Sequence, residues 1–276
     1  MKTLRGRTAA ITGAASGLGR AMALAFADEG MHLALADVDE KGLALTKEEI
    51  ERKGVKASST RVDVSRASDV DAFAASLKEV HVVCNNAGVS PVGPLWENTT
   101  ADWQWALGVN LWGVIHGVRA FVPRLVAQGE GHVVNTASVA GLISPPGMGV
   151  YNVTKHAVVA LSESLHHDLR VQGSPVGVSV LCPAYVPTGI SDSERNRPKE
   201  LQNSAKKSSQ QEMLAQHLKK AVSSGKLTAG DVARAVVAAI KENRFYILTH
   251  PRIKGAIQAR MEDILQERAP RNPLAL

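Results

Sequence analysis

Three side chains with complementary acid–base chemistry lie close together in the middle of the sequence. Tyr151 is followed four residues later by Lys155, and Ser138 lies thirteen residues upstream of Tyr151. Residues four apart share one face of a helix, so the phenol and the ammonium group can act together. The ammonium charge favours the phenolate, and the Ser138 hydroxyl can hydrogen-bond an oxygen whose charge changes during reaction. This spacing predicts a proton-transfer site with Tyr151 as general acid/base.

A glycine-rich segment near the N-terminus predicts a turn that binds phosphate groups. Residues 12–19 read TGAASGLG, after a short apolar run and before a helical pattern, which is the context that such a turn requires. The first glycine permits the turn, and the later glycines let a pyrophosphate approach the backbone and the helix N-terminus. The spacing is GxxxGxG rather than GxGxxG, so a turn without a ligand is the alternative interpretation. The expected contacts are Gly13, Ser16, Gly17, Leu18 and Gly19.

A carboxylate after the second apolar run predicts which dinucleotide this turn binds. Asp37 lies eighteen residues after Gly19, where it can accept hydrogen bonds from both ribose hydroxyls of an adenosine. The same charge repels a 2′-phosphate, and neither Ser16 nor Val38 supplies a compensating positive charge. The sequence therefore favours NAD over NADP. The alternative is that Asp37 only caps the helix that begins near Asp39.

Short apolar runs alternate with helical segments along the chain. The runs are bounded by glycine or polar turns, as buried strands are, and the alternation predicts right-handed βαβ crossovers and a mainly parallel sheet covered on both faces. The expected strands are 8–11, 31–36, 80–84, 132–135, 176–181 and 245–248, and the expected helices are 18–28, 39–52, 67–78, 103–128 and 149–171.

No linker divides the chain, so residues 1–276 are expected to form a single dinucleotide-binding and catalytic domain. The polar residues 191–226 predict a helical excursion beside the substrate, either a mobile lid or an ordinary pair of surface helices. Residues 250–276 predict a C-terminal helix and tail. Apolar residues at helical spacing between 250 and 266 suit packing on the body or on another subunit.

The composition excludes several classes of function. The formal net charge is +6, but no basic run exceeds two residues and no aromatic residues are interleaved with it, so no nucleic-acid partner is expected. Cys84 and Cys182 are far apart, without CxxC spacing or a histidine cluster, so no metal site is expected. The long uncharged stretches are broken by proline and glycine, and no export signal is evident. A cytoplasmic protein without membrane helices is expected.

Together with the segment NNAG at residues 85–88, these motifs resemble the short-chain dehydrogenase/reductase family over residues 5–250. Further motifs that carry the resemblance are Asp63–Val64, Asn110 and the segment 183–188. The resemblance implies a single Rossmann-type, doubly wound α/β domain with a seven-stranded, mainly parallel sheet flanked by helices. It also implies a homo-oligomer, a dimer or a tetramer.

The same resemblance implies roles for individual residues. Asp63 and Val64 would border the adenine, and Asn86, Ala87 and Gly88 would support the cofactor and the central strand. Val186 and Thr188, in the segment that begins at Pro183, would hold the nicotinamide carboxamide. Lys155, beside Tyr151, would contact the nicotinamide ribose, and Asn110 would hold a water that connects Lys155 with solvent. Ala184 replaces the glycine that usually follows the proline and adds a methyl group near the nicotinamide.

The sequence therefore predicts an NAD-dependent alcohol dehydrogenase or ketone reductase. Apolar residues between 142 and 148, with Tyr185 and the excursion at 191–226, are expected to form the substrate walls. They favour a hydrophobic secondary alcohol and its ketone. One alternative is a sugar-nucleotide epimerase or dehydratase, which would normally need a larger C-terminal domain. The other is a non-enzymatic dinucleotide-sensing regulator, although such sensors commonly lose the Tyr–Lys pair.

Overall fold

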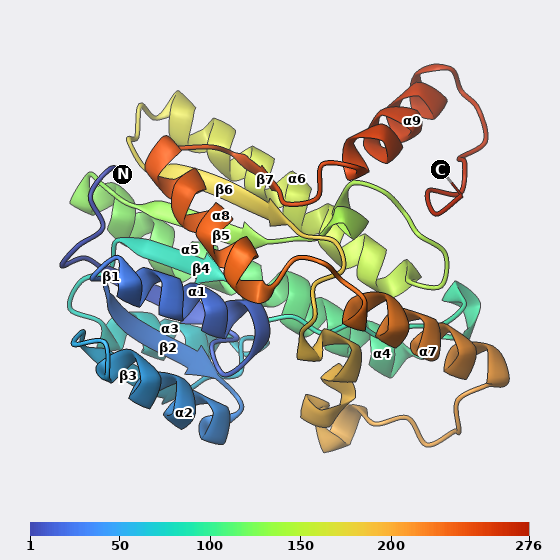
Figure 1. The fold of residues 1–276 in the computed structure, drawn as a ribbon, viewed down its shortest axis with the longest axis horizontal. Coiled ribbons are helices and arrows are strands. Elements are labelled where there is room, and N and C mark those ends of the chain that lie inside the picture. The colour runs from blue at the N-terminus through green and yellow to red at the C-terminus, as the bar shows by residue number, and fades with distance from the viewer. Residues whose placement is uncertain (276) are drawn as a thin grey trace.

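The computed structural model describes residues 1–275 and contains one seven-stranded sheet in which every strand pair is parallel (Figure 1). The strand order is β3-β2-β1-β4-β5-β6-β7, which reverses between β1 and β4. This topology confirms the predicted doubly wound Rossmann-type fold. The strands are β1 (Thr8–Thr12), β2 (His32–Asp37), β3 (Ala57–Arg61), β4 (Val82–Asn85), β5 (His132–Thr136), β6 (Gly177–Cys182) and β7 (Tyr246–Leu248).

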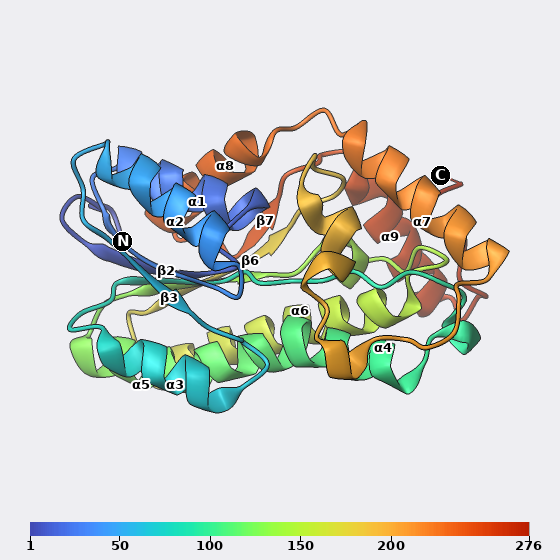
Figure 2. The ribbon, with the colours of Figure 1, turned by 90° about the horizontal axis from the view of Figure 1, so that it is seen from below.

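Helices cover both faces of the sheet (Figure 2). Aliphatic side chains fill the two interfaces: Ile11 of β1 and Ile240 belong to the cluster on one face, and Phe73 and Phe121 to the cluster on the other. Because both faces are covered, the central strands are continuous apolar runs. One layer contains α1 (Gly17–Asp28), α2 (Glu40–Glu51) and α8 (Ala229–Glu242), and the other contains α3 (Ala67–Ser76), α4 (Thr100–Ala106), α5 (Gly113–Gln128) and α6 (Gly149–Val171).

The edge strand β3 was not predicted from an apolar run. Its sequence is ASSTR, and four of its five residues are exposed. It pairs in parallel register with β2, with Leu33 opposite Ala57 and Asp37 opposite Arg61. Main-chain pairing at a solvated sheet edge holds this strand, so it carries no hydrophobic pattern.

The helix predicted for residues 103–128 is interrupted. A π-helical segment, η2 (Leu107–Trp112), separates α4 from α5. Such segments are frequent at functional sites because the wider turn displaces main-chain groups from their usual partners. Asn110 lies in this segment and is fully buried.

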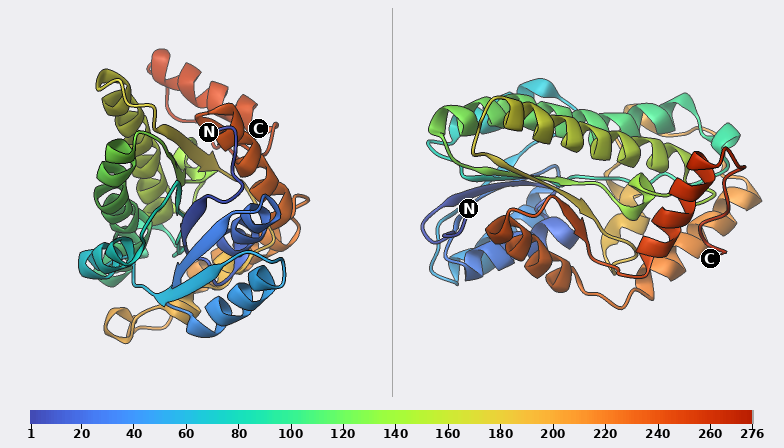
Figure 3. Two further views of the ribbon diagram at one scale, coloured as in Figure 1. Left: turned by 90° about the vertical axis from the view of Figure 1, so that its left-hand side faces the viewer. Right: turned by 90° about the horizontal axis from the view of Figure 1, so that it is seen from above.

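The C-terminal third adds helices beyond the carboxyl ends of the strands, at the end of the molecule away from the N-terminus (Figure 3). The excursion consists of the 3₁₀ helices η4 (Gly189–Asn196) and η5 (Lys199–Leu201) followed by α7 (Ser209–Ser223). The last helix is α9 (Ile253–Leu265). Across residues 1–275, no helix has the length and apolar character needed to span a bilayer.

The apolar stripe of α9 packs on the body only in part. Ala256 and Ala259 are buried, whereas Met261, Ile264 and Leu265 are 43%, 55% and 82% exposed. Ile253 and Ile257 are half-buried. Packing on the body therefore accounts for the first half of the stripe and leaves its C-terminal residues for packing on another subunit.

Candidate active site

The predicted catalytic and cofactor residues line one cavity at the carboxyl ends of the strands. Its volume is about 520 Å³, and it lies beside the point where the strand order reverses, between β1 and β4. This is where ligands bind in open α/β sheets. The predicted residues that line it are Gly13, Ser16, Gly17, Leu18, Asp37, Asp63, Val64, Asn86, Ala87, Gly88, Ser138, Tyr151, Lys155, Pro183, Val186 and Thr188. Gly19 and Asn110 are not among the lining residues.

The glycine-rich turn is packed so closely that side chains are excluded at two of its positions. A Cβ on Gly13 would lie 2.8 Å from the Cα of Ala87, and one on Gly19 would lie 2.0 Å from the Gly13 carbonyl oxygen. Gly13 also has a φ of +68°, which favours glycine. Asn86 ties the turn to the loop after β4 by donating its side-chain amide to the Thr12 carbonyl, at 3.0 Å.

The N-terminus of α1 is available to an anion. Ser16 is the N-cap residue, but its side chain accepts no capping hydrogen bond, and the first turn contains no acidic residue. The N–H groups at a helix start carry partial positive charge and favour anions. Gly17, with a φ of +55°, lies next to Thr188, whose Cβ would be 3.3 Å from an added Cβ. These features fit a pyrophosphate group.

Asp37 ends β2 at the rim of the same cavity. Its Oδ2 accepts from the backbone N–H of Ala15 at 3.0 Å, and its Oδ1 accepts from Asp39 N–H at 3.1 Å. The cap of α2 is Asp39, which accepts from Gly42 N–H at 3.0 Å. The alternative that Asp37 serves only as the helix cap is therefore wrong.

Sequence reasoning missed two arginines at this end of the cavity. Arg61 lies opposite Asp37 in the pairing of β3 with β2, and Arg66 follows the Asp63–Val64 segment. Both line the cavity. The unpredicted strand β3 brings Arg61 to Asp37, so residue spacing gave no signal for it. These positive charges bear directly on the choice between NAD and NADP.

Tyr151 and Lys155 lie one turn apart at the start of α6, facing the end of β5. The Lys155 Nζ lies 5.6 Å from the centre of the Tyr151 ring and donates to the Thr136 carbonyl oxygen at 2.8 Å. Ser138 follows β5, donates to the Pro183 carbonyl oxygen at 3.3 Å and accepts from Ala140 N–H at 3.1 Å. The Ser138 hydroxyl is near enough to the Tyr151 phenol to lower its pKa. The three groups predicted to act together therefore meet.

In the protein without cofactor, burial disfavours the charged forms of both Tyr151 and Lys155. Burial raises the pKa of Tyr151 to about 12, although the Ser138 hydroxyl lowers it and the nearby Cys182 raises it. Burial lowers the pKa of Lys155 to about 8, against the opposing effect of Cys182. Lys155 is only 2% exposed. Its charge therefore does not by itself make the phenol acidic, and a further positive charge is needed.

The side-chain amide of Asn110 makes three hydrogen bonds to protein groups. Oδ1 accepts from Val89 N–H at 2.8 Å, and Nδ2 donates to the Val89 carbonyl at 2.9 Å and to Thr154 Oγ1 at 3.1 Å. Asn110 Oδ1 and Lys155 Nζ both approach Gly88, at 3.5 and 3.6 Å from an added Cβ. Asn110 thus joins the loop after β4 to α6 beneath the catalytic pair.

The rest of the cavity wall differs in part from the sequence expectation. The residues 142–148 and Tyr185 do not line this cavity; a Cβ on Gly147 would lie 2.7 Å from Leu214 of α7, so that loop packs against the excursion instead. Ala184 lines the cavity, and its N–H donates to His250 Nδ1 at 3.2 Å. The excursion lines the cavity as expected, through Arg195, Asn196, Glu200, Leu201 and Val222, whereas Gln104 and Trp105 of α4 were not predicted.

The fold and the cavity together define a Rossmann-type dinucleotide-binding protein, and comparison with known proteins narrows this class. The model of the short chain dehydrogenase family matches residues 7–199. That match covers most of the chain, which therefore belongs to the short-chain dehydrogenase/reductase family of oxidoreductases.

Relatives and solved structures agree with this assignment. The CLA biosynthesis dehydrogenase/reductase of Lactiplantibacillus plantarum is 32% identical over 98% of this chain and 97% of its own length. The 1-deoxy-11-beta-hydroxypentalenate dehydrogenase of Streptomyces avermitilis is 33% identical over 95% of this chain and 91% of its own length. A short chain dehydrogenase/reductase from Burkholderia phymatum, solved in complex with NAD, has a TM-score of 0.97 at 52% identity and 100% coverage of both chains.

Proposed function

We propose that this protein oxidises a hydrophobic secondary alcohol to its ketone, and catalyses the reverse reduction, with NAD as the cofactor and Tyr151 as general acid/base. The observation that carries the proposal is the convergence of Tyr151, Lys155 and Ser138 in the cavity that also holds the glycine-rich turn and Asp37. Proton-transfer groups and a dinucleotide cradle in one cavity are the two requirements of hydride-transfer chemistry.

The chain's own residues handle the proton and the oxygen. When bound, the oxidised nicotinamide ring accepts the hydride and adds a positive charge to that of Lys155. Two positive charges beside the phenol oppose the effect of burial and lower the pKa of Tyr151 toward the working pH. The phenolate then accepts the alcohol proton, while Ser138 hydrogen-bonds the substrate oxygen as its charge changes. In ketone reduction, Tyr151 returns the proton.

Lys155 and Asn110 supply the route by which the proton reaches solvent. The side-chain amide of Asn110 bonds Val89 and Thr154, and its Oδ1 keeps a lone pair that can accept from a relay water. Lys155 reaches the same region beside Gly88. The Asn110 side chain also joins the π-helical segment to the loop after β4 and to α6.

Asp37 supports NAD as the preferred cofactor. One of its oxygens accepts from Ala15 N–H of the turn and the other from Asp39 N–H at the start of α2, so the carboxylate is held in place to receive ribose hydroxyls and to repel a 2′-phosphate. The solved relative from Burkholderia phymatum contains NAD. Arg61 and Arg66 oppose this preference, because either can attract a phosphate.

The cavity wall supports a hydrophobic substrate with one polar contact region. Trp105, Leu201 and Val222 contribute apolar surface, whereas Gln104 and Glu200 are polar. Two relatives are named as dehydrogenases of a hydroxy compound, the 1-deoxy-11-beta-hydroxypentalenate dehydrogenases. A cyclic or aromatic secondary alcohol is the class that we expect.

Three further aspects of the proposal concern the whole protein. We propose that residues 191–226 form a lid over the substrate within a single catalytic domain, that the protein is a dimer or tetramer, and that it works in the cytoplasm. The exposed apolar residues of α9 support an oligomer.

The proposal is tested by cofactor titration followed by a substrate screen. Nicotinamide fluorescence should give a lower Kd for NADH than for NADPH. Absorbance of the reduced nicotinamide should then rise when the protein is mixed with NAD and a hydrophobic secondary alcohol. Tighter binding of NADPH would contradict the role of Asp37, and dinucleotide binding without any turnover on alcohols or ketones would favour the sensing regulator.

A further inference from the structure

One arginine reaches the glycine-rich turn from the opposite side of the cavity. Arg195 lies in η4, and its Nη2 is 3.5 Å from Ser16 Oγ. Its Nη1 donates to the carbonyl oxygens of Gly189 and Asp192, each at 2.8 Å. Within residues 1–275, its hydrogen-bond partners are thus uncharged oxygens, so no carboxylate neutralises the guanidinium.

The surface that faces Arg195 is the start of α1. Ser16 is the N-cap residue of this twelve-residue helix, and it makes no side-chain capping bond. The helix start and Arg195 line the same cavity. An anion placed between them would receive the helix N–H groups on one side and a guanidinium on the other.

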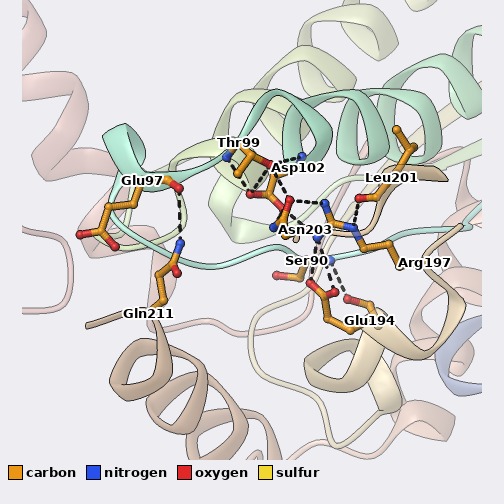
Figure 4. A network of polar contacts seen from close by, with 10 residues as sticks. Ser90, Glu97, Thr99, Asp102, Glu194, Arg197, Leu201, Asn203 and Gln211 are labelled. Carbon is orange, nitrogen blue, oxygen red and sulfur yellow. Dashed lines mark hydrogen bonds and ion pairs between the residues drawn. The ribbon is translucent and has the colours of Figure 1, made fainter. Parts of the chain in front are cut away.

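A buried ion pair fixes the backbone that carries Arg195 (Figure 4). Two residues further on, Arg197 is 3% exposed, and its Nη1 lies 2.7 Å from Oδ1 of Asp102 in α4, which is 6% exposed. The Arg197 guanidinium also lies 5.0 Å from the ring centre of Trp105. Asn203 donates to Asp102 at 3.0 Å, which adds a second attachment from the same segment.

We propose that Arg195 binds the pyrophosphate of the cofactor from the side opposite the glycine-rich turn, and that the Arg197–Asp102 pair positions it there. This inference rests on the proposed dinucleotide function. The pyrophosphate is the favoured anion, rather than a 2′-phosphate, because Asp37 repels the latter. Arg195 then couples cofactor binding to the position of the excursion. Arg197 and Asp102 are positioning residues that touch neither cofactor nor substrate.

The first test compares Arg195→Gln with Arg252→Gln, a control at another exposed arginine that does not line the cavity. Loss of a charge-assisted hydrogen bond should raise the Kd for NADH, measured by fluorescence, about tenfold or more. ADP-ribose keeps the pyrophosphate, so its affinity as a competitor of NADH should fall by the same factor in the variant. The affinity of adenosine, which has no phosphate, should not change. The NADH affinity of the wild type should also fall more steeply with salt concentration than that of Arg195→Gln.

Several outcomes would overturn the assignment. Equal NADH affinity in Arg195→Gln and wild type would remove Arg195 from the site, and an effect confined to NADPH would assign it to a 2′-phosphate. If the wild-type protein bound neither dinucleotide, the proposed function would fail together with this inference. Normal wild-type binding with an unaffected variant would overturn the inference alone.

The second test is a double-mutant cycle for the positioning pair. Asp102→Asn should weaken NADH binding in the wild-type background but have no further effect in Arg195→Gln, because both changes act through one contact. Additive effects on Kd, or a lowered Tm with an unchanged Kd, would overturn the positioning role. If Asp102→Asn fails to fold because a buried arginine loses its partner, Arg197→Lys is used instead. It keeps the charge and should show the same pattern.

Discussion

At the scale of single residues, the site depends on two buried groups whose charged forms are both disfavoured. Tyr151 is held neutral and Lys155 is only weakly basic when the protein is alone. In the proposed mechanism, the bound cofactor would activate the phenol as well as accept the hydride. Proton abstraction would then be limited to the complex in which a hydride acceptor is present.

Removal of the phenol oxygen should separate catalysis from cofactor binding. In Tyr151→Phe, kcat for alcohol oxidation should fall by about 10² to 10⁴, the usual contribution of a general acid/base. The Kd for NADH should change by less than about twofold, because the ring remains. Steady-state kinetics and fluorescence titration measure the two quantities, with Tyr185→Phe as the control. Undiminished turnover in Tyr151→Phe would remove the catalytic assignment.

The buried Lys155 should destabilise the folded protein at neutral pH and make the free energy of unfolding depend more strongly on pH. Its pKa falls from 10.5 to about 8 on folding, so the native state binds fewer protons than the unfolded state between these values, and stability rises with pH there. Lys155→Met removes this effect. The free energy of unfolding of the variant, measured relative to that of the wild type, should therefore be about 2 kcal/mol higher at pH 7 than at pH 9.5.

Urea denaturation of the cofactor-free protein at the two pH values measures this difference. Lys155→Met should also lose activity, which would identify the lysine as a group retained for function at a cost in stability. A constant stability difference between variant and wild type across this pH range would show that Lys155 does not titrate as described.

The convergence of the proposed catalytic residues in one cavity was predictable, because these residues are close together in the sequence or follow apolar runs. Tyr151 and Lys155 share one helix face, and Ser138 and Asp37 each follow an apolar run. Arg61 and Arg195 were not predictable, since they reach the cavity through a polar edge strand and through a 3₁₀ helix fixed by distant contacts. The hydrogen bonds of Asn110 Oδ1 and Nδ2 to the main chain of Val89 also could not be predicted from the spacing of residues.

At the scale of elements, the turn between β1 and α1 works only because it packs on the loop after β4. Gly19→Ala would place a Cβ 2.0 Å from the Gly13 carbonyl oxygen, which forces the turn to move. The variant should unfold at a lower urea concentration and bind NADH at least about tenfold more weakly, as for loss of a charge-assisted contact.

Gly255→Ala provides the matched control, because this glycine lies inside α9 with no atom near the added Cβ. It should leave NADH binding unchanged and raise stability by about 0.5 to 1 kcal/mol. Both free energies of unfolding come from the same urea titration. NADH affinity in Gly19→Ala equal to that of Gly255→Ala would contradict the close packing of the turn.

The elements themselves were predictable where hydrophobic period was strong. The central strands and the main helices occur close to their expected ranges, because buried elements have recognisable apolar patterns in the sequence. The strand β3 and the π-helical break at 107–112 were missed. The first depends on main-chain pairing, and the second on tertiary hydrogen bonds of Asn110, so neither alters the local apolar pattern.

At the scale of the whole molecule, α9 presents apolar residues that the body does not cover. Ile264 and Leu265 are adjacent and largely exposed, with Met261 one turn earlier. Clusters of this kind on a protein surface mark interaction sites, so we expect light scattering to give the mass of a dimer or tetramer. Leu265→Asp should reduce that mass.

Val171→Asp serves as the control for this experiment, because Val171 is 89% exposed at the end of α6, away from α9. It should leave the assembled mass unchanged. A monomeric wild-type protein, or equal masses for the two variants, would remove α9 from the interface.

The order of motifs along the chain was enough to predict the doubly wound fold and its cavity, because each motif follows a strand at the same edge of the sheet. The substrate wall was less predictable. The excursion lines the cavity as predicted, but the loop at 142–148 packs against α7 and α4 contributes lining that was not predicted. The contacts between α4 and the excursion join segments about a hundred residues apart.

The most direct test of the account is titration of the Tyr151 phenol with and without NAD, followed by absorbance near the phenolate band. The chain has three tyrosines, so the Tyr151 signal is taken as the difference from Tyr151→Phe. We expect a pKa of about 12 without cofactor and a pKa lower by several units with NAD, and Lys155→Met should diminish this shift. A phenol whose pKa is the same in the presence and absence of NAD would contradict the account.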